Sequence, residues 1–140
     1  MIKGKLTEHF AWSELCVNTR IWGKQLPNEP DVESVRALRA LTENVLEPFR
    51  KILGVPMIIT SGFRTKQNNY LVGGKVNSQH LKGQAADFYA KGLTAVGALK
   101  RIVDSDTFVD FDQLICYRTK GFIHVSYKAE GGNRREVLYT

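Results

Sequence analysis

The stretch Ser78-Gln79-His80-Leu81-Lys82-Gly83-Gln84-Ala85-Ala86-Asp87 places a histidine and an aspartate seven positions apart across a glycine turn. A second histidine, His124, lies later in the apolar run Phe122-Ile123-His124-Val125-Ser126-Tyr127. Two imidazoles and one carboxylate are a known catalytic zinc set, because three protein ligands leave the fourth position for water. The sequence therefore predicts a metal site built from His80, Asp87 and His124.

The surroundings of these three residues favour a metal over their ordinary roles. Asp87 lies in an otherwise apolar stretch, where a carboxylate is costly unless it is paired or bound to a cation. A salt bridge to Arg64 is the alternative, but the flanking alanines favour a metal because small side chains let the backbone approach a ligand cluster. Gly83 can turn the chain so that His80 and Asp87 face one point. His124, inside an apolar strand, needs a partner for its ring nitrogens.

Other polar side chains have both a functional and a structural interpretation. Arg64 ends the motif Ser61-Gly62-Phe63-Arg64. It is expected to clamp a substrate carboxylate or charge that develops in the transition state, unless it pairs with a nearby acid. Ser78 is a candidate hydrogen-bond donor to substrate, unless it only organises its turn. His9, in a polar N-terminal segment, is expected to make structural hydrogen bonds.

Length and composition indicate a single domain of 140 residues, too short to divide into two. The formal net charge of +6 and the pI near 9.4 favour polyanionic surroundings, such as nucleic acid or an anionic cell-wall polymer. The basic residues are dispersed and match no nucleic-acid-binding module, so no nucleic-acid partner is expected. Neither a membrane span nor a signal peptide is expected, because the chain lacks the apolar runs that both require. Cys16 and Cys116 fit no metal-binding spacing and are expected to be buried or half-buried free thiols.

An apolar stripe at three- and four-residue steps predicts a helix from Pro30 onwards. The stripe comprises Val32, Val35, Leu38, Leu41, Val45, Leu46, Phe49 and Ile52. Pro30 suits a first helical turn, and Gly54 suits a C-terminal stop. Pro48 lies inside the pattern and should kink the helix or end a first helix early. Residues 17–28, before the stripe, are expected to be turn-like.

The rest of the chain alternates predicted strands and helices. Strands are expected at 57–61 and 84–89, and helices at 65–72 and 93–103. Residues 113–117 and 122–127 are expected to form a hairpin across 118–121, with a last strand at 136–139. Helices and strands mixed in this way, with a late antiparallel hairpin, indicate an α+β fold.

The residues around the predicted metal group resemble the D-alanyl-D-alanine metallo-carboxypeptidase family, in its short phage-associated and bacterial C-terminal-domain branch. The core, Ser-x-His-x-x-Gly-x-Ala-x-Asp with a later His-Val-Ser, is highly specific, and the resemblance covers nearly the whole chain. The matching segments are Leu6-Thr7-Glu8-His9-Phe10, Glu14-Leu15, Leu46-Glu47-Pro48, Ile59-Thr60-Ser61-Gly62-Phe63-Arg64, Asn69, Val72-Gly73-Gly74, Ser78-Gln79-His80-Leu81-Lys82-Gly83, Ala85-Ala86-Asp87, Phe111-Asp112-Gln113-Leu114-Ile115 and Ile123-His124-Val125-Ser126.

This resemblance implies the Hedgehog/DD-peptidase α+β fold, a small antiparallel sheet with helices packed around it, as one zinc peptidase-like domain over residues 1–140. It implies one zinc ion with His80, Asp87 and His124 as ligands, and Arg64 as the arginine that stabilises substrate and transition state. Members cleave peptidoglycan stem peptides, either trimming a terminal D-alanine or cutting within the stem. The implied reaction is peptide hydrolysis by a metal-activated water, with a carboxylate as general base.

The general base is where the sequence departs from the family pattern. Relatives in this branch often carry a glutamate shortly after the Asp-Gln-Leu-Ile run, and other branches carry an acid three residues before the last histidine. These two places hold Tyr117 and Gly121 here, and no acid lies between Asp112 and His124. The base is therefore expected in a neighbouring segment or is absent. Asp112 is the preferred candidate of three, which are Asp110, Asp112 and Glu130.

The predicted hairpin indicates which side chains surround His124. If residues 118–121 form the turn, Ile115 pairs with His124, and Gln113 and Tyr117 share its face. Gln113 and Tyr117 are therefore expected to contact substrate, together with Ser78. Tyr117, rather than a carboxylate, is expected beside the metal.

Three functions follow from these observations. The leading one is a zinc peptidase acting on peptidoglycan, phage- or prophage-derived, which stays in the cytoplasm until it is released and reaches the cell wall. The second is a non-catalytic, zinc-stabilised module that binds the cell wall or a virion, because the usual acidic base is missing. The third, nucleic-acid binding through net charge, has no recognisable module to support it.

Overall fold

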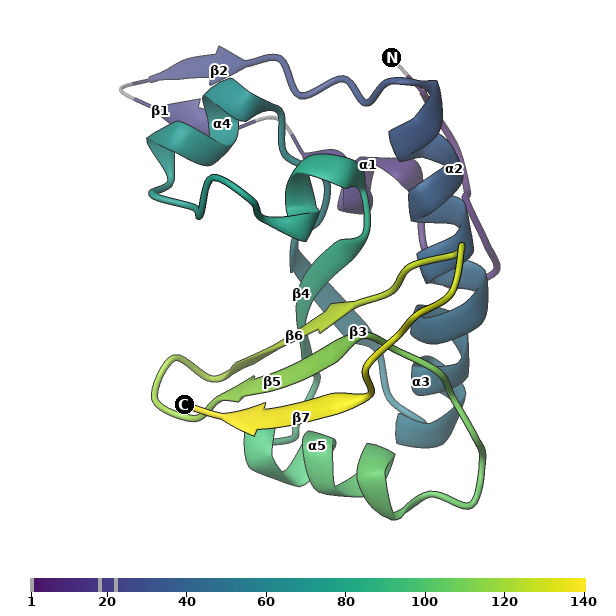
Figure 1. Ribbon diagram of the computed structural model, residues 1–140. Helices are drawn as coiled ribbons and strands as arrows, with labels where there is room; N and C mark the ends of the chain where they lie inside the picture. The colour runs from purple at the N-terminus through teal and green to yellow at the C-terminus, as the bar shows by residue number, and fades with distance from the viewer. Residues whose placement is uncertain (1, 18, 22) are drawn as a thin grey trace.

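A five-stranded sheet with helices packed against it forms the body of the protein (Figure 1). The computed structural model describes residues 2–17, 19–21 and 23–140. The sheet has the strand order β3-β4-β6-β5-β7. Its strands are β3 (Met57–Ser61), β4 (Ala85–Ala90), β5 (Gln113–Tyr117), β6 (Phe122–Ser126) and β7 (Glu136–Tyr139). The predicted α+β fold is confirmed.

The sheet is mixed, which corrects the expectation of a purely antiparallel one. The first four strands pair antiparallel, but β7 runs parallel to β5. After β6 the chain returns to the start of β5, where the Glu136 N–H donates to the Asp112 carbonyl over 3.0 Å. A strand that enters at the start of β5 has to run in the same direction as β5.

The pairing of the central strands sets the two faces of the sheet. In the β5–β6 hairpin Ile115 lies opposite His124, as predicted. Asp87 of β4 lies opposite His124 on its other side. Paired residues on neighbouring strands project to the same face, so these side chains share one face. The alternate residues, Leu114 and Ile123 among them, are fully buried on the other face.

A continuous helical run lies along one side of the molecule (Figure 1). It consists of α2 (Val32–Leu41), a π-helical turn η1 (Thr42–Leu46) and α3 (Glu47–Leu53). Pro48 lies in the first turn of α3, and the wider π-helical turn comes directly before α3. Because proline cannot donate a backbone hydrogen bond, the predicted disturbance at Pro48 takes the form of this turn. Gly54 ends the run with a positive φ of 69°, as its position predicted.

Shorter elements complete the fold. They are α1 (Trp12–Leu15), α4 (Lys66–Leu71), the 3₁₀ helix η2 (Gln79–Lys82) and α5 (Ala95–Asp104). The Thr65 and Thr94 side chains cap α4 and α5, each accepting a hydrogen bond from the third residue that follows it. Residues 17–28 were expected to be turn-like, but they contain a two-stranded hairpin of β1 (Thr19–Ile21) and β2 (Lys24–Leu26).

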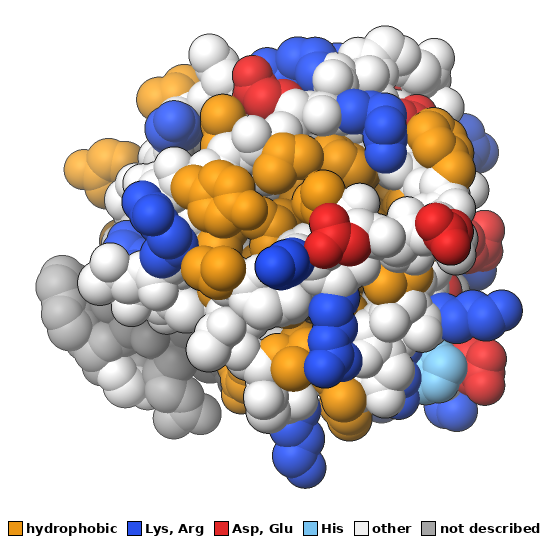
Figure 2. All heavy atoms as spheres, turned by 90° about the horizontal axis from the view of Figure 1, so that it is seen from below, with side chains coloured by type: hydrophobic (Ala, Val, Ile, Leu, Met, Phe, Trp, Pro, Cys, Tyr) orange, Lys and Arg blue, Asp and Glu red, His pale blue; other side chains and the backbone are white. Residues whose placement is uncertain are grey.

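The hydrophobic core lies between the sheet, the helical run and α5. Phe49 of α3 packs against Phe88 of β4 with ring centroids 6.4 Å apart. Seen from the α5 end, hydrophobic side chains also gather on the surface among basic ones (Figure 2). The exposed hydrophobic side chains of α5 and the loop after it are Val96, Val103 and Phe108.

Two smaller predictions can be compared with the structure. Cys16 is half-buried and Cys116 is buried, and both are free thiols, as expected. Burial and the charge of Glu29 raise the pKa of Cys16 to about 11, so this thiol is unreactive at neutral pH. Within the described residues, no helix has the length and apolar character needed to cross a membrane.

Candidate metal centre

Three side chains converge on one point of the open face of the sheet. His80 comes from η2, Asp87 from β4 and His124 from β6, and their ligand atoms all lie within 4.8 Å of one another. Asp87 Oδ1 is 2.8 Å from His124 Nδ1 and 3.3 Å from His80 Nε2. The group that the sequence predicted is therefore brought together by the fold.

Local backbone geometry explains why these side chains meet. Asp87 and His124 are direct partners in the β4–β6 ladder, so their side chains stand side by side. Gly83 ends η2 with a positive φ of 71° and passes so close to α2 that an added Cβ would collide with the Ser34 carbonyl. Gly83 therefore allows the tight turn that places His80 against Asp87.

His80 is held so that one ring nitrogen faces the group with its lone pair free. Its Nδ1 lies 2.7 Å from the Gly62 carbonyl oxygen, which can only accept a hydrogen bond. Nδ1 therefore carries the proton, and Nε2 is left unprotonated in the neutral ring. Nε2 is buried and has no aligned hydrogen-bond partner among the described residues. A buried acceptor in this position is costly unless a cation occupies the site, so the residues fit a zinc ion.

The charge of Asp87 is stabilised by its neighbours. Burial on its own raises the pKa of this carboxyl, but the hydrogen bond from His124 and the close approach of both imidazoles outweigh burial and hold the pKa well below its usual range. Asp87 is therefore an ionised ligand candidate at neutral pH.

Arg64 lies at the edge of the same group. Its Nη2 is 3.7 Å from Asp87 Oδ2, so the ion pair considered as an alternative to metal binding is present as well. Arg64 Nε donates to Ser61 Oγ over 3.1 Å and Nη1 to Asn69 Oδ1 over 3.2 Å. Burial lowers the pKa of Arg64, and Asp87 counteracts that effect. The guanidinium stays charged, because the pKa of arginine is far above neutral.

A cleft of about 800 Å³ opens above the three ligand candidates. All the other predicted site residues line it: Arg64, Ser78, Asp112, Gln113 and Tyr117. One wall comes from residues 72–84 and the other from the β5–β6 hairpin and the segment after it. A cavity of this size accommodates a short peptide.

A family profile described as peptidase M15 matches residues 8–126, more than half of the chain. The chain belongs to the peptidase M15 family. Members of this family are zinc-dependent peptidases of the D-Ala-D-Ala carboxypeptidase type, which confirms the resemblance seen in the sequence. A comparison with curated proteins gave no match.

Membership of the M15 family makes the His80, Asp87 and His124 group a candidate zinc site, and the family match contains all three residues. The match ends at residue 126 and so includes Asp112 but not β7 or the segment that leads to it. Asp112 therefore lies inside the match, whereas Lys128 and Arg134, which contact it, lie outside it.

Asp112, the preferred candidate base, lines the cleft but is bound by cations. Its carboxylate accepts two hydrogen bonds from the Arg134 guanidinium, at 3.0 and 2.9 Å, and one from the Arg134 backbone N–H at 3.0 Å. Lys128 Nζ lies 3.7 Å away. The Arg134 hydrogen bonds outweigh burial and lower the pKa of Asp112 to about 2. A carboxylate with this pKa is a weak base at neutral pH.

The two other candidate bases lie away from the metal group. Asp110 accepts a hydrogen bond from Asn133 Nδ2 over 3.3 Å and lies 3.9 Å from Arg135, and Glu130 is exposed. Among the described residues that line the cleft, only Asp87 and Asp112 carry a carboxylate. Of the three candidate general bases, Asp112 is therefore the one that lines the cleft.

The remaining predicted residues have partners of their own. Ser78 Oγ accepts from the His80 backbone N–H over 3.2 Å, so it caps η2. Gln113 Nε2 donates to Glu136 Oε1 over 2.5 Å. The Tyr117 ring stacks on Phe122, with centroids 4.5 Å apart and 16° between the planes. Their predicted contacts with substrate stay predictions.

Sequence reasoning gave no role to Asn69, although the residue is part of the family resemblance. Asn69 is buried, accepts from Arg64 and donates to the Lys75 carbonyl over 2.8 Å. Gly74 passes so close that an added Cβ would collide with the Asn69 side chain. The glycine pair Gly73-Gly74 after the predicted helix was the sequence signal that could have pointed to this close approach.

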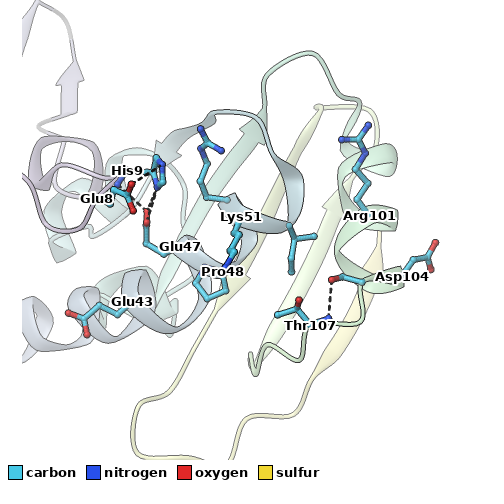
Figure 3. A pocket seen from close by; sticks show the side chains of 12 residues that line it. Glu8, His9, Glu43, Glu47, Pro48, Lys51, Arg101, Asp104 and Thr107 are labelled. Atoms are coloured by element: carbon cyan, nitrogen blue, oxygen red, sulfur yellow. Dashed lines mark hydrogen bonds and ion pairs between the residues drawn. The ribbon is translucent and has the colours of Figure 1, made fainter.

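A second hollow, of about 1150 Å³, lies away from the metal group (Figure 3). His9 lies at its edge, where its backbone N–H and its Nδ1 both bond to Glu47 Oε1, at 3.1 and 2.8 Å. The structural role expected for His9 is thus confirmed. Side chains of both charges from α3, α5 and the N-terminal segment line this hollow. The three predicted metal ligands line the other cleft.

Proposed function

We propose that this protein is a zinc-dependent peptidase that hydrolyses peptidoglycan stem peptides, either as a D-alanyl-D-alanine carboxypeptidase or as a related endopeptidase. One observation carries the proposal: His80 Nε2, buried and without a hydrogen bond among the described residues, faces Asp87 and His124 beside the Arg64 guanidinium. A group built only for stability would satisfy this nitrogen within the protein.

In this proposal His80, Asp87 and His124 hold the metal. When bound, zinc supplies Lewis acidity, polarising a peptide carbonyl and making water nucleophilic near neutral pH. For His124 to bind the metal through Nδ1, the proton that this nitrogen shares with Asp87 in the metal-free protein would move to Nε2 of the same ring or to solvent, because the donor nitrogen has to be unprotonated. Arg64, fixed through two of its nitrogens, presents its positive charge to a substrate carboxylate or to the charge that develops on the carbonyl oxygen.

Asp112 is proposed as the general base, and it can act only after partial release from Arg134. The Arg134 side chain is 53% exposed, so it can turn towards solvent or towards a substrate carboxylate. Release removes the hydrogen bonds that depress the pKa of Asp112 and makes this carboxylate a stronger base. Substrate binding would then prepare the acid for proton transfer.

A second candidate function is a non-catalytic, zinc-stabilised module that binds the cell wall or a virion. The observation that favours it is that both carboxylates lining the described part of the cleft are already paired. In either case we propose action at the cell wall after release from the cytoplasm, with a phage or prophage origin.

Digestion of purified peptidoglycan and synthetic stem peptides with zinc-loaded protein tests the proposal. Mass spectrometry of the products, beside a His124→Ala control, should show fragments from the parent protein only, and their masses name the bond that is cut. Failure of zinc-loaded protein to cleave any stem peptide would overturn the peptidase. Cosedimentation with peptidoglycan in that case would support the binding module.

A further inference from the structure

The five-stranded sheet has two edge strands, β3 and β7, and they differ in what covers them (Figure 1). Helix α1 packs against β3, and the Phe63 N–H, just after β3, donates to the Leu15 carbonyl at the end of α1 over 2.7 Å. In the part of the chain that the structure describes, β5 is the only element that packs extensively against β7. The edge formed by β7 is therefore open.

Alternate residues of β7 leave their backbone groups free at this edge. The N–H groups of Glu136 and Thr140 donate to the β5 side, at 3.0 and 2.9 Å. Residues two apart along a strand point their backbone groups to the same side, so Leu138 also faces β5. The N–H and C=O groups of Val137 and Tyr139 therefore point away from the sheet, in the arrangement that pairs with another strand.

The side chains of this edge are apolar and exposed. Val137 is 38% exposed, Leu138 40% and Tyr139 54%. Proteins commonly protect an open edge with lysine or proline, and β7 contains neither. Its one charged residue, Glu136, lies at the start of the strand. The edge thus combines free backbone groups with apolar side chains, as a strand that pairs with another chain does.

The β7 sequence is complementary to itself in an antiparallel pairing. With Leu138 on a two-fold axis, Val137 of each copy lies opposite Tyr139 of the other, and each such pair exchanges two backbone hydrogen bonds. The two Leu138 side chains then meet on the axis. Glu136 lies opposite the uncharged Thr140, so no like charges are paired. One register therefore satisfies the free backbone groups and matches the apolar side chains.

We infer that two copies of this protein associate through their β7 edges into a two-fold dimer, which joins the two five-stranded sheets into one. This inference concerns a surface outside the metal group and does not depend on the proposed peptidase function. Antiparallel pairing at an edge requires an axis perpendicular to the sheet, so both metal groups open to the same side. The two β6 strands lie five strand spacings apart, about 24 Å. The dimer presents two clefts to one extended surface.

Sedimentation of the parent protein, with and without zinc, tests the association itself. The pairing of a four-residue strand makes a small interface, so the dissociation constant should be on the order of 100 µM. Measurements between about 10 µM and about 1 mM should therefore show a reversible conversion of monomer to dimer. A parent protein that stays monomeric at about 1 mM would overturn the inference.

Charge exchange at Leu138 tests the register. Leu138→Lys alone and Leu138→Glu alone each place two like charges opposite each other on the axis and should abolish the dimer. An equimolar mixture should restore it, because opposite charges then meet. Val76→Lys and Val76→Glu provide the matched controls, since Val76 is 87% exposed in the loop after α4, outside the sheet. They should associate as the parent does, and circular dichroism checks that every variant is folded.

Two results of the charge exchange would overturn the inference. One is a mixture of the Leu138 variants that stays as monomeric as each variant alone. The other is an equal loss of the dimer in the Val76 controls, which would mean that β7 is not the site of association.

A disulfide at the axis tests the same register covalently. Directly opposed residues that exchange no backbone hydrogen bonds have Cα atoms about 4.5 Å apart, within the range that a disulfide spans. Leu138→Cys should therefore form a cross-linked dimer under mild oxidation, while Val76→Cys should stay largely monomeric. Cys16 and Cys116 are half-buried and buried, so the parent protein gives the background. Equal cross-linking of the two variants would reject Leu138 as the residue on the axis.

Discussion

Asp87 and Asp112 are two buried carboxylates in one cleft, and their partners differ in kind. Asp87 lies between two imidazole nitrogens that can each bind a metal ion, with Arg64 at 3.7 Å. Asp112 accepts a bidentate pair of hydrogen bonds from the Arg134 guanidinium and a third hydrogen bond from the Arg134 backbone N–H. Arginine keeps its protons under all ordinary conditions.

The difference indicates that partner chemistry, more than burial, distinguishes a candidate metal ligand from an acid whose charge is held by the protein's own cations. Asp87 is 8% exposed and Asp112 is 1% exposed, so burial does not separate them. The group around Asp87 has an acceptor without a hydrogen bond among the described residues, His80 Nε2, which leaves room for a cation from outside. The group around Asp112 already contains its cations. We therefore expect the two aspartates to respond in opposite ways to the same substitution.

Zinc affinity should show the largest contrast. Asp87→Asn removes a charged ligand and should weaken zinc binding by more than about 100-fold, the upper end of the loss seen for a partner that only supports a ligand. Asp112→Asn should change it by no more than about twofold, the usual coupling between sites that share no partner. Competition with a chelating dye measures both.

His80→Ala and His124→Ala are the companions to this measurement, since each removes one imidazole from the group. Each should resemble Asp87→Asn in zinc affinity. Equal affinities for the Asp87 and Asp112 variants would contradict the assignment of Asp87 as the ligand and remove the basis of the comparison.

The stability of the metal-free protein should show the reverse order. Asp112→Asn weakens the charged hydrogen bonds to Arg134 and should lower the free energy of unfolding by about 2 kcal/mol, the range for a hydrogen bond to a charged group. Asp87→Asn should cost less in metal-free protein, because an amide oxygen can still accept from His124. Urea unfolding with chelator present measures both, and a greater loss for Asp87→Asn would reverse our interpretation.

Much of the Asp87 region was predictable from sequence because its partners lie in local patterns. The turn at residues 118–121 fixed the pairing of Ile115 with His124, and Gly83 indicated how His80 could face Asp87. Alternation along a strand then assigned faces to the other residues. The helical run and its stop at Gly54 followed from apolar spacing and glycine geometry in the same way.

The Asp112 region was not predictable, because its partners carry no motif. Lys128 and Arg134 lie 16 and 22 positions along the chain in an irregular segment beyond the family match. The end of β6, where the Asp112 N–H donates to the Ser126 carbonyl, brings Lys128 near Asp112, and the approach to β7 brings Arg134 back to it. Arg135 has a positive φ of 51°, a strained conformation for a non-glycine residue, and such a turn has no sequence signature. The β1–β2 hairpin was missed for a similar reason, since its short strands lack apolar alternation.

Acid should destabilise the protein through Asp112 in a defined pH window. The pKa of Asp112 is about 2 in the folded protein, below the value near 3.9 of an unfolded aspartate. A depressed folded-state pKa contributes stability that is fully present above the unfolded pKa and is lost as pH falls through the folded pKa. The stability difference between parent and Asp112→Asn should therefore be constant above about pH 5 and shrink towards pH 2.

Chemical unfolding at a series of pH values measures this difference. Taking the difference between two proteins cancels the contributions of the other acids, Asp87 included. A difference that stays constant down to pH 2, or grows there, would show that Arg134 does not hold the Asp112 charge in solution.

The smallest expected effect is on catalysis and concerns Asn69. The Asn69 side chain accepts a hydrogen bond from Arg64 and so holds that guanidinium beside Asp87. Asn69→Ala removes the acceptor of Arg64 Nη1 and the tie to Lys75, so the guanidinium loses its fixed direction. We expect kcat on a stem peptide to fall about tenfold, at the low end of the cost of a misplaced catalytic group. Zinc affinity should stay unchanged.

Asn68 provides the matched control, because it is the neighbouring buried asparagine on α4 and, unlike Asn69, makes no hydrogen bond to Arg64 in the described part of the chain. Its side chain donates to the Pro27 carbonyl at 2.9 Å and to Thr65 Oγ1 at 2.8 Å. Asn68→Ala should lower thermal stability as Asn69→Ala does, yet leave kcat as in the parent protein. An equal fall in kcat for both variants would mean that α4 packing matters and Asn69 has no positioning role. A fall for Asn69→Ala alone would show that the two arginines differ as their aspartates do, with Arg64 held ready for substrate and Arg134 engaged with the protein itself.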